Sequence, residues 1–261
     1  MKKRDGIAFE RGGGSGKLLV LIHGLGGTGG VWSRFVEAAP QGWASGWLAL
    51  DLPGHGASAR LPSYGIGDYA HAVAGLIATE AQQNSVVILG HSLGGAVALM
   101  LGSPEYAIAV DAIFGLGIKT DWSSDDLARL AILSHRAPRM FETRDEALAQ
   151  HARACGLGDI GLDSPLLDRG VVEDAGKWRL AMDGRAFAIS PPPMASLTAQ
   201  ARCPTFLSRG QDDAMVSETS VRHFDRGAVS IPSAGHNAMV DNPDGVWTWM
   251  MSHRPTMEDT A

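Results

Sequence analysis

The sequence has few cysteines, no long hydrophobic run and no excess of basic residues. Its 261 residues include only Cys155 and Cys203, which lack a C-x-x-C spacing, so we expect no disulfide framework. No apolar stretch reaches the length of a membrane span, and the start of the chain lacks the apolar core of a signal peptide. These absences predict a cytoplasmic protein that does not insert into a membrane.

The net charge argues against a nucleic-acid-binding protein, and the histidine spacing argues against a metal-binding one. The formal net charge is −6, from 22 basic and 28 acidic residues, whereas a nucleic-acid-binding surface needs clustered lysine and arginine. The nine histidines include no H-E-x-x-H pattern and no close cluster with aspartate. We therefore expect neither a nucleic-acid partner nor a metal ion.

Short apolar runs alternate with helical patterns along most of the chain. This rhythm is typical of βαβ units and predicts an α/β fold, a mainly parallel sheet with helices on both faces. The length suits one such domain, or one core domain with an inserted segment. The runs that we expect to form strands are 18–22, 47–50, 86–89, 112–116, 204–208 and 228–231.

The alternation breaks between residues 119 and 195, where the sequence becomes helical and irregular. Ser123 or Ser124 is expected to cap one helix there, and Thr143 with Glu146 forms a capping box for another. We interpret 119–195 as a mostly helical cap inserted over one end of the sheet, with 1–118 and 196–261 as the core domain. Residues 256–261 are expected to fray.

The run 86–99 contains a sharp turn between a buried strand and a buried helix. The turn is Gly90-His91-Ser92-Leu93-Gly94, which matches the G-x-S-x-G nucleophile elbow. Such a turn strains the central residue, and side chains two positions to either side would clash, so glycine is required there. Ser92 is thereby expected above the sheet, at the positive end of a helix.

Serine needs a positioned base before it can act as a nucleophile. Two loops that follow predicted strands offer the partners, one with Asp212 and Asp213 and the other with His236. Nucleophile, acid and histidine in this chain order are typical of the G-x-S-x-G fold.

With these motifs the chain resembles the α/β-hydrolase superfamily of esterases, lactonases and related enzymes. The resemblance covers nearly the whole chain except 119–195, which corresponds to the segment that often forms a helical cap in the family. The motifs that carry it are His23-Gly24 with its glycine-rich loop, Asp51-x-Pro53-Gly54-His55-Gly56-x-Ser58, Gly90-His91-Ser92-Leu93-Gly94-Gly95, Gly210-x-x-Asp213-x-x-Val216 and Gly235-His236.

The resemblance implies a catalytic triad and an oxyanion hole. Ser92 would be the nucleophile, His236 the general base and acid, and Asp213 the acid that orients the histidine. Asp213 is preferred to the neighbouring carboxylate because the family's Gly-x-x-Asp-x-x-Val spacing selects it. The backbone N–H groups of Leu25 and Leu93 would form the oxyanion hole.

The cap segment contains large apolar side chains that could line a substrate pocket or form the cap's own core. They are Trp122, Met140, Phe141, Trp178, Met182 and Phe187.

The sequence thus predicts a serine hydrolase that needs no cofactor and acts through an acyl-enzyme. Its partner would be a small or medium acyl substrate, a carboxylic ester, lactone or thioester. A C–C bond hydrolase of the same fold is less favoured, because the loop after His23 lacks the Gly-Pro-Gly sequence common in those enzymes. A ligand-binding protein on the same scaffold is an alternative from another class.

A dinucleotide-binding interpretation also deserves comparison. The loop Gly24-x-Gly26-x-x-Gly29 follows a predicted strand, and Asp51 ends the next one, as in NAD-dependent oxidoreductases. This alternative leaves Ser92, Asp213 and His236 unexplained, so we rank it well below hydrolysis.

Overall fold

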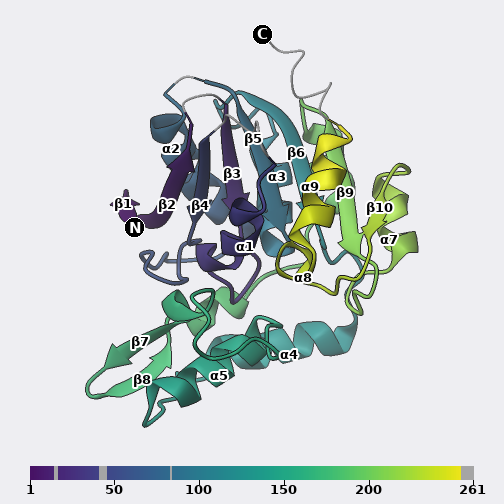
Figure 1. The fold of residues 1–261 in the computed structure, drawn as a ribbon. Helices are drawn as coiled ribbons and strands as arrows, with labels where there is room; N and C mark the ends of the chain where they lie inside the picture. Colours follow the sequence, from purple (N-terminus) through teal and green to yellow (C-terminus); the bar gives the residue numbers. More distant parts are fainter. Residues whose placement is uncertain (15–16, 41–45, 83, 254–261) are drawn as a thin grey trace.

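The fold is a twisted, mainly parallel sheet with helices on both faces (Figure 1). The computed structural model describes residues 1–14, 17–40, 46–82 and 84–253. The tail expected to fray, 256–261, lies outside these residues. The eight strands of the described sheet run in the order β1-β2-β4-β3-β5-β6-β9-β10. Their bounds are β1 Lys2–Arg4, β2 Ile7–Gly13, β3 Leu18–Ile22, β4 Gly46–Leu50, β5 Val86–His91, β6 Val110–Leu116, β9 Thr205–Gly210 and β10 Val229–Ile231.

The neighbouring strands in the series β4-β3-β5-β6-β9-β10 all pair in parallel, as the alternating pattern predicts. The first two strands are different, because β1 pairs antiparallel with β2, and β2 pairs antiparallel with β4. The sequence analysis did not predict these two strands. The exposed residues of β1 and the polar end of β2 lack the apolar run that marked the other strands.

Both faces of the sheet are buried. In β3, Leu18, Val20 and Ile22 belong to one hydrophobic cluster, whereas Leu19 and Leu21 belong to a second one. Side chains alternate between the faces of a strand, so a continuous apolar run is needed where helices cover both faces.

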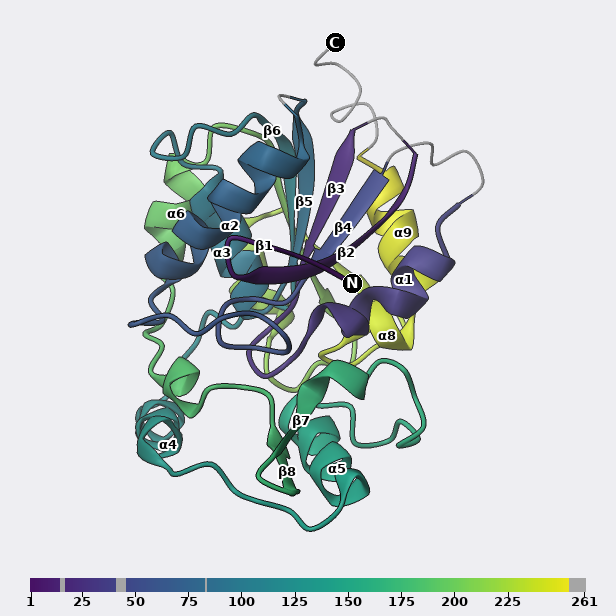
Figure 2. The same cartoon turned by 90° about the vertical axis from the view of Figure 1, so that its left-hand side faces the viewer.

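Two sets of helices cover these faces (Figure 2). On one face lie α2 Ile66–Glu80, α3 Leu93–Leu101, α6 Met194–Gln200 and α7 Glu218–Phe224. On the other lie η1 Gly29–Trp32, α1 Ser33–Glu37, α8 Ala238–Asp241 and α9 Pro243–Met251. Helices α1 and α9 meet on this second face, where the Trp247 ring stacks on Phe35 at 4.3 Å and donates its Nε1–H to the Phe35 carbonyl.

The elements between β6 and α6 lie together at one end of the sheet (Figures 1 and 2). They are α4 Ser124–His135, α5 Arg144–Ala154, η2 Asp168–Gly170, β7 Val171–Asp174, β8 Lys177–Leu180 and η3 Gly184–Phe187. Ser123 caps α4 and Thr143 caps α5, each within a capping box, so these predicted helix starts are confirmed.

The cap also contains a hairpin that the sequence analysis read as loose structure. Strands β7 and β8 pair antiparallel around Ala175 and Gly176, which both have positive φ angles. Two positive-φ residues form the kind of tight turn that joins two antiparallel strands. None of the described helices combines the length and apolarity that a membrane span requires.

Candidate active site

The sheet order places two loops on either side of a crevice. The chain passes from β3 to β4 on one side and then returns to β5 on the other side of β3. The loops after β3 and β5 therefore lead away from each other at the carboxyl ends of adjacent strands. In open α/β sheets this reversal point is where ligands bind.

Ser92 occupies the turn between β5 and α3 in a strained conformation. Its φ of 52° and ψ of −117° lie in a region that residues with a side chain rarely adopt, and its N–H donates to the Leu116 carbonyl at 2.8 Å. A Cβ on Gly90 would overlap the Gly94 carbonyl, and a Cβ on Gly94 would overlap the Ile22 carbonyl. The structure thus has the elbow geometry that the motif predicts.

His236 and Asp213 form a hydrogen-bonded pair in the loops after β10 and β9. His236 Nδ1 lies 2.9 Å from Asp213 Oδ2, and the aspartate side chain is fully buried. Burial alone would raise the pKa of Asp213, but the hydrogen bond and charge of His236 and the Met215 N–H lower it below its usual value. An ionised Asp213 only accepts hydrogen bonds, so Nδ1 carries the proton and Nε2 has a free lone pair.

A half-buried arginine that the sequence analysis did not single out holds the Asp213 loop. The Arg209 guanidinium donates to the backbone carbonyls of Asp213 and Val216 and to Ser230 Oγ. The side chain of Asp212, by contrast, is exposed, and only its backbone N–H is tied, to the Ala234 carbonyl. Asp213 is therefore the carboxylate that reaches His236.

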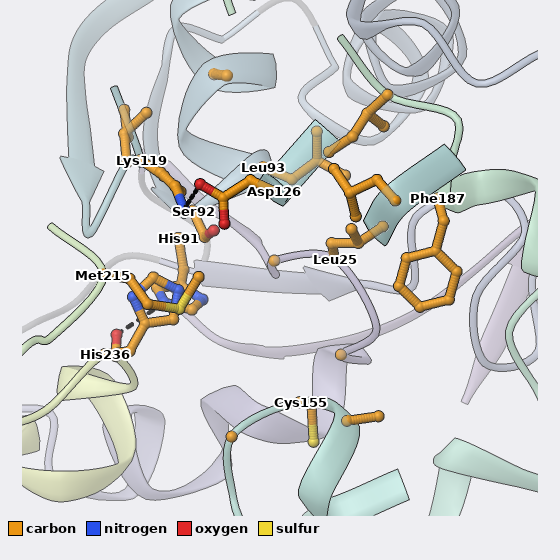
Figure 3. A pocket seen from close by; sticks show the side chains of 18 of the residues that line it. Leu25, His91, Ser92, Leu93, Lys119, Asp126, Cys155, Phe187, Met215 and His236 are labelled. Atoms are coloured by element: carbon orange, nitrogen blue, oxygen red, sulfur yellow. Dashed lines mark hydrogen bonds and ion pairs between the residues drawn. The ribbon is translucent and has the colours of Figure 1, made fainter. Parts of the chain in front are cut away.

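Ser92 and His236 line the same cavity (Figure 3). No hydrogen bond joins the Ser92 hydroxyl to the His236 ring, although both residues are described. Contacts between nucleophile and base are often loose before substrate binds. His91 links the turn that carries Ser92 to the loop that carries His236, because its Nε2–H donates to the His236 carbonyl at 2.8 Å.

The backbone amides of Leu25 and Leu93 border this cavity. Within the described residues, neither N–H has a hydrogen-bond acceptor, so both can donate to a ligand in the cavity. The loop that carries Leu25 is held by His23, whose Nε2 accepts from Leu52 N–H and whose Nδ1 donates to the Gly24 carbonyl. Burial, with the nearby His55 ring, lowers the pKa of His23 well below its usual value, which keeps the ring neutral.

Asp51 has a structural role in this region. Its buried carboxylate accepts from Gly29 N–H at 2.7 Å and from Ala57 N–H at 3.0 Å, and Arg169 Nη1 lies 3.4 Å away. In a dinucleotide site this carboxylate would hydrogen-bond to a ribose, whereas here it is buried and accepts hydrogen bonds from the protein backbone. This arrangement argues against the NAD-binding interpretation.

The cavity measures about 640 Å³ and extends from the elbow to the cap. Two of the six apolar cap residues, Trp122 and Phe187, line it. The other four, all in the described part of the chain, are not in its wall, and this corrects the expectation for Met140, Phe141, Trp178 and Met182.

These four residues belong to the cap or the adjoining core. The backbones of Phe141 and Trp178 exchange two hydrogen bonds, of 2.7 and 2.9 Å. Met182 packs against the core cluster on the α2 and α3 face, and Met140 is exposed.

The cavity wall also contains polar residues for which the sequence analysis had no motif. Lys119 Nζ forms an ion pair with Asp126 Oδ2 at 2.8 Å (Figure 3). The hydrogen bonds from Lys119 and Ser123 lower the pKa of Asp126 to about 2, so this carboxylate is ionised at neutral pH. Cys155 is also in the wall, and burial raises the pKa of its thiol to about 11, which leaves it protonated and a poor nucleophile.

No group of three or more metal-ligating side chains comes together within the described ranges. The cavity brings together a hydroxyl, an imidazole hydrogen-bonded to a carboxylate, and two backbone amides.

Comparison with known proteins places this site in a family context. The sequence model described as the alpha/beta hydrolase family matches residues 19–249. The chain is 34% identical over 118 residues to the dihydrolipoyllysine-residue acetyltransferase component of the acetoin cleaving system of Cupriavidus necator, a match that covers 43% of this chain and 31% of that protein. It is 23% identical over 194 residues to protein phosphatase methylesterase 1 of Pongo abelii, covering 65% and 49%. The chain thus spans half or less of the length of these curated relatives.

Solved structures show the same fold across almost the whole chain. E-2-(acetamidomethylene)succinate hydrolase is 20% identical, with a TM-score of 0.78 and 95% of both chains covered. An esterase from Mycobacterium tuberculosis is 21% identical, with a TM-score of 0.76, 97% of this chain and 89% of that chain covered.

Proposed function

The chain belongs to the alpha/beta hydrolase family, and we propose that it is a serine hydrolase that cleaves a carboxylic ester without a cofactor. The observation that carries this proposal is the convergence of three groups on one cavity. Ser92 lies on its strained turn, His236 hydrogen-bonds to the buried Asp213, and the amides of Leu25 and Leu93 are free. The curated relative named as a methylesterase supports ester cleavage, as does the neighbour named as an esterase.

In the proposed reaction, Ser92 Oγ attacks the ester carbonyl carbon while His236 Nε2 takes the hydroxyl proton. The carbonyl π electrons move to the oxygen, and the amides of Leu25 and Leu93 stabilise the resulting oxyanion. Collapse of this intermediate breaks the bond to the alcohol, which receives the proton from His236 and leaves an acyl-enzyme. Water then repeats the sequence, with His236 as base, and releases the acid and free Ser92.

Asp213 orients the imidazole and stabilises its protonated form without itself taking the proton. Its environment suits this role, because the fully buried carboxylate has its two oxygens bound by His236 and by the Met215 N–H. The cavity of about 640 Å³ suits a small or medium substrate, and lactones and thioesters react through the same steps.

The proposal is tested with short-chain p-nitrophenyl esters in stopped flow. We expect a burst of one p-nitrophenol per active site, and Ser92→Ala should lower kcat by at least about 10⁴-fold. Cys155→Ala is the matched control, since this thiol borders the same cavity but is not the nucleophile. Equal turnover by Ser92→Ala and the parent protein contradicts the proposal. Labelling of Ser92 by a fluorophosphonate without turnover of any ester would instead indicate a ligand-binding protein.

A further inference from the structure

The cavity wall has an excess of positive charge. Its charged side chains are Lys119, Arg129 and Arg153, with Asp126 as the single acidic residue among the described residues of the wall. The chain as a whole carries a formal charge of −6. Basic groups are therefore concentrated at the proposed substrate site of an otherwise acidic protein, which attracts anions to this site.

The two arginines lack an acidic partner among the residues that the structure describes. Lys119 is neutralised by Asp126, and its ammonium also lies 5.2 Å from the centre of the Trp122 ring. In the described structure both side chains are exposed. Arg129 has no ion pair, and the Arg153 guanidinium hydrogen-bonds only to the neutral Gln150 Oε1, at 3.3 Å. Two guanidinium groups, each with five N–H donors, are thus available to a ligand.

The arginines come from two different helices of the cap. Arg129 lies on α4, one turn after Asp126, and Arg153 lies near the end of α5. Figure 2 shows these helices on opposite sides of the cap. The end of α5 lies against the loop of the proposed oxyanion hole. A Cβ placed on Gly26 of that loop would be 3.7 Å from the Ala154 carbonyl oxygen, which is van der Waals contact. The wall of this one cavity contains both arginines and Ser92.

We propose that the substrate carries a carboxylate, and that Arg129 and Arg153 bind it. This inference rests on the serine hydrolase function proposed above and specifies its substrate class, an ester with a free acid group. Guanidinium is the side-chain group whose planar donors match a carboxylate in pairs. The remaining wall, with Trp122, Leu130 and Phe187, contacts the apolar part of such a molecule.

The test compares charged esters with their neutral counterparts. Mono-4-nitrophenyl adipate places the carboxylate on the acyl side, and its methyl ester is the neutral partner. 4-Butyryloxybenzoate carries its carboxylate on the alcohol side, and the methyl ester of that carboxylate is the neutral partner. For at least one of the two pairs we expect kcat/KM of the charged ester to exceed that of the neutral ester by about tenfold or more. This preference should weaken in 1 M salt.

The double variant Arg129→Gln, Arg153→Gln should reduce the preference to within about twofold, mainly by lowering kcat/KM for the charged esters. Arg136→Gln is the control, because this exposed arginine follows α4 but does not border the cavity. A preference that survives the double variant, or no preference in either pair, overturns the inference. In those cases Ser92-dependent turnover of the neutral esters still supports the hydrolase proposal.

A second measurement separates the two proposals in the other direction. Monomethyl adipate is titrated calorimetrically into the Ser92→Ala variant, with and without the two arginine substitutions. Binding that depends on the arginines supports the carboxylate site even if no ester is turned over. Equal affinity, or no binding by either protein, contradicts it.

Discussion

Four buried histidines should make this protein sensitive to mild acid. His23, His55, His91 and His151 are each at most 4% exposed. Burial lowers the pKa of His55 to about 4, that of His91 to about 3 and that of His151 to about 4, against an unperturbed 6.5. The pKa of His23 is lowered as well, again mainly by burial.

The sign of the effect follows from proton uptake. Between pH 6.5 and the lowered pKa values, the unfolded chain binds protons that the folded chain does not, so acid favours unfolding. For each histidine with a pKa near 3 or 4, the free energy of unfolding falls by slightly less than about 2 kcal/mol between pH 7 and pH 5. His55, His91 and His151 together therefore contribute a loss between about 5 and 6 kcal/mol. His23 adds to this loss, whereas Asp51, whose pKa burial raises, opposes it.

The assay is urea unfolding followed by tryptophan fluorescence at pH 7 and at pH 5. A loss of about 5 kcal/mol moves the unfolding midpoint down by roughly 2 M urea. In the variant His151→Gln one titrating group is absent, so the difference between the two pH values should shrink by about 2 kcal/mol. His71→Gln is the control, because His71 is exposed on α2 and meets water in both states.

Equal midpoints at pH 5 and pH 7 would refute this reasoning. So would a His151→Gln variant with the same pH difference as the parent protein. The comparison between two pH values remains informative even if the substitution lowers stability at both, because only the difference reports proton uptake.

Three further predictions concern the site and the elbow. Asp213→Asn should lower kcat by about 10⁴-fold because it removes the ionised partner of His236, whereas Asp212→Asn should stay within about twofold of the parent in the same p-nitrophenyl ester assay. Gly94→Ala should destabilise the fold by about 2 kcal/mol or more in urea unfolding, since its Cβ would overlap backbone, whereas Gly67→Ala on α2 has open space and should be neutral or slightly stabilising. Arg209→Gln should lower kcat more than it changes KM in steady-state kinetics, because the loop that holds Asp213 loses the hydrogen bonds from the guanidinium group. An unchanged kcat contradicts this positioning role.

The sequence alone determined the parts of this protein whose signals are local. Buried strands covered on both faces need continuous apolar runs, so 18–22 and 86–89 could be recognised directly. The elbow could be recognised because its backbone excludes a Cβ at Gly90 and Gly94. The helix starts at Ser123 and Thr143 also depend on neighbouring residues only.

The sequence did not predict strands that lack an apolar run. The strands of the β7–β8 hairpin and the exposed strand β1 carry mostly polar or half-buried residues. For such strands the pairing with a neighbour decides the structure, and no apolar run marks them.

Only the tertiary structure decided which distant residues meet. His91 binds the carbonyl of His236, 145 residues along the chain, and this contact joins the loop of Ser92 to the loop of His236. The membership of the cavity wall was equally a matter of packing, since Trp122 borders it whereas Trp178 pairs with Phe141 in the cap. Residue spacing encodes backbone conformation over a few positions, whereas the direction in which a cap side chain points depends on how the whole segment packs against the sheet.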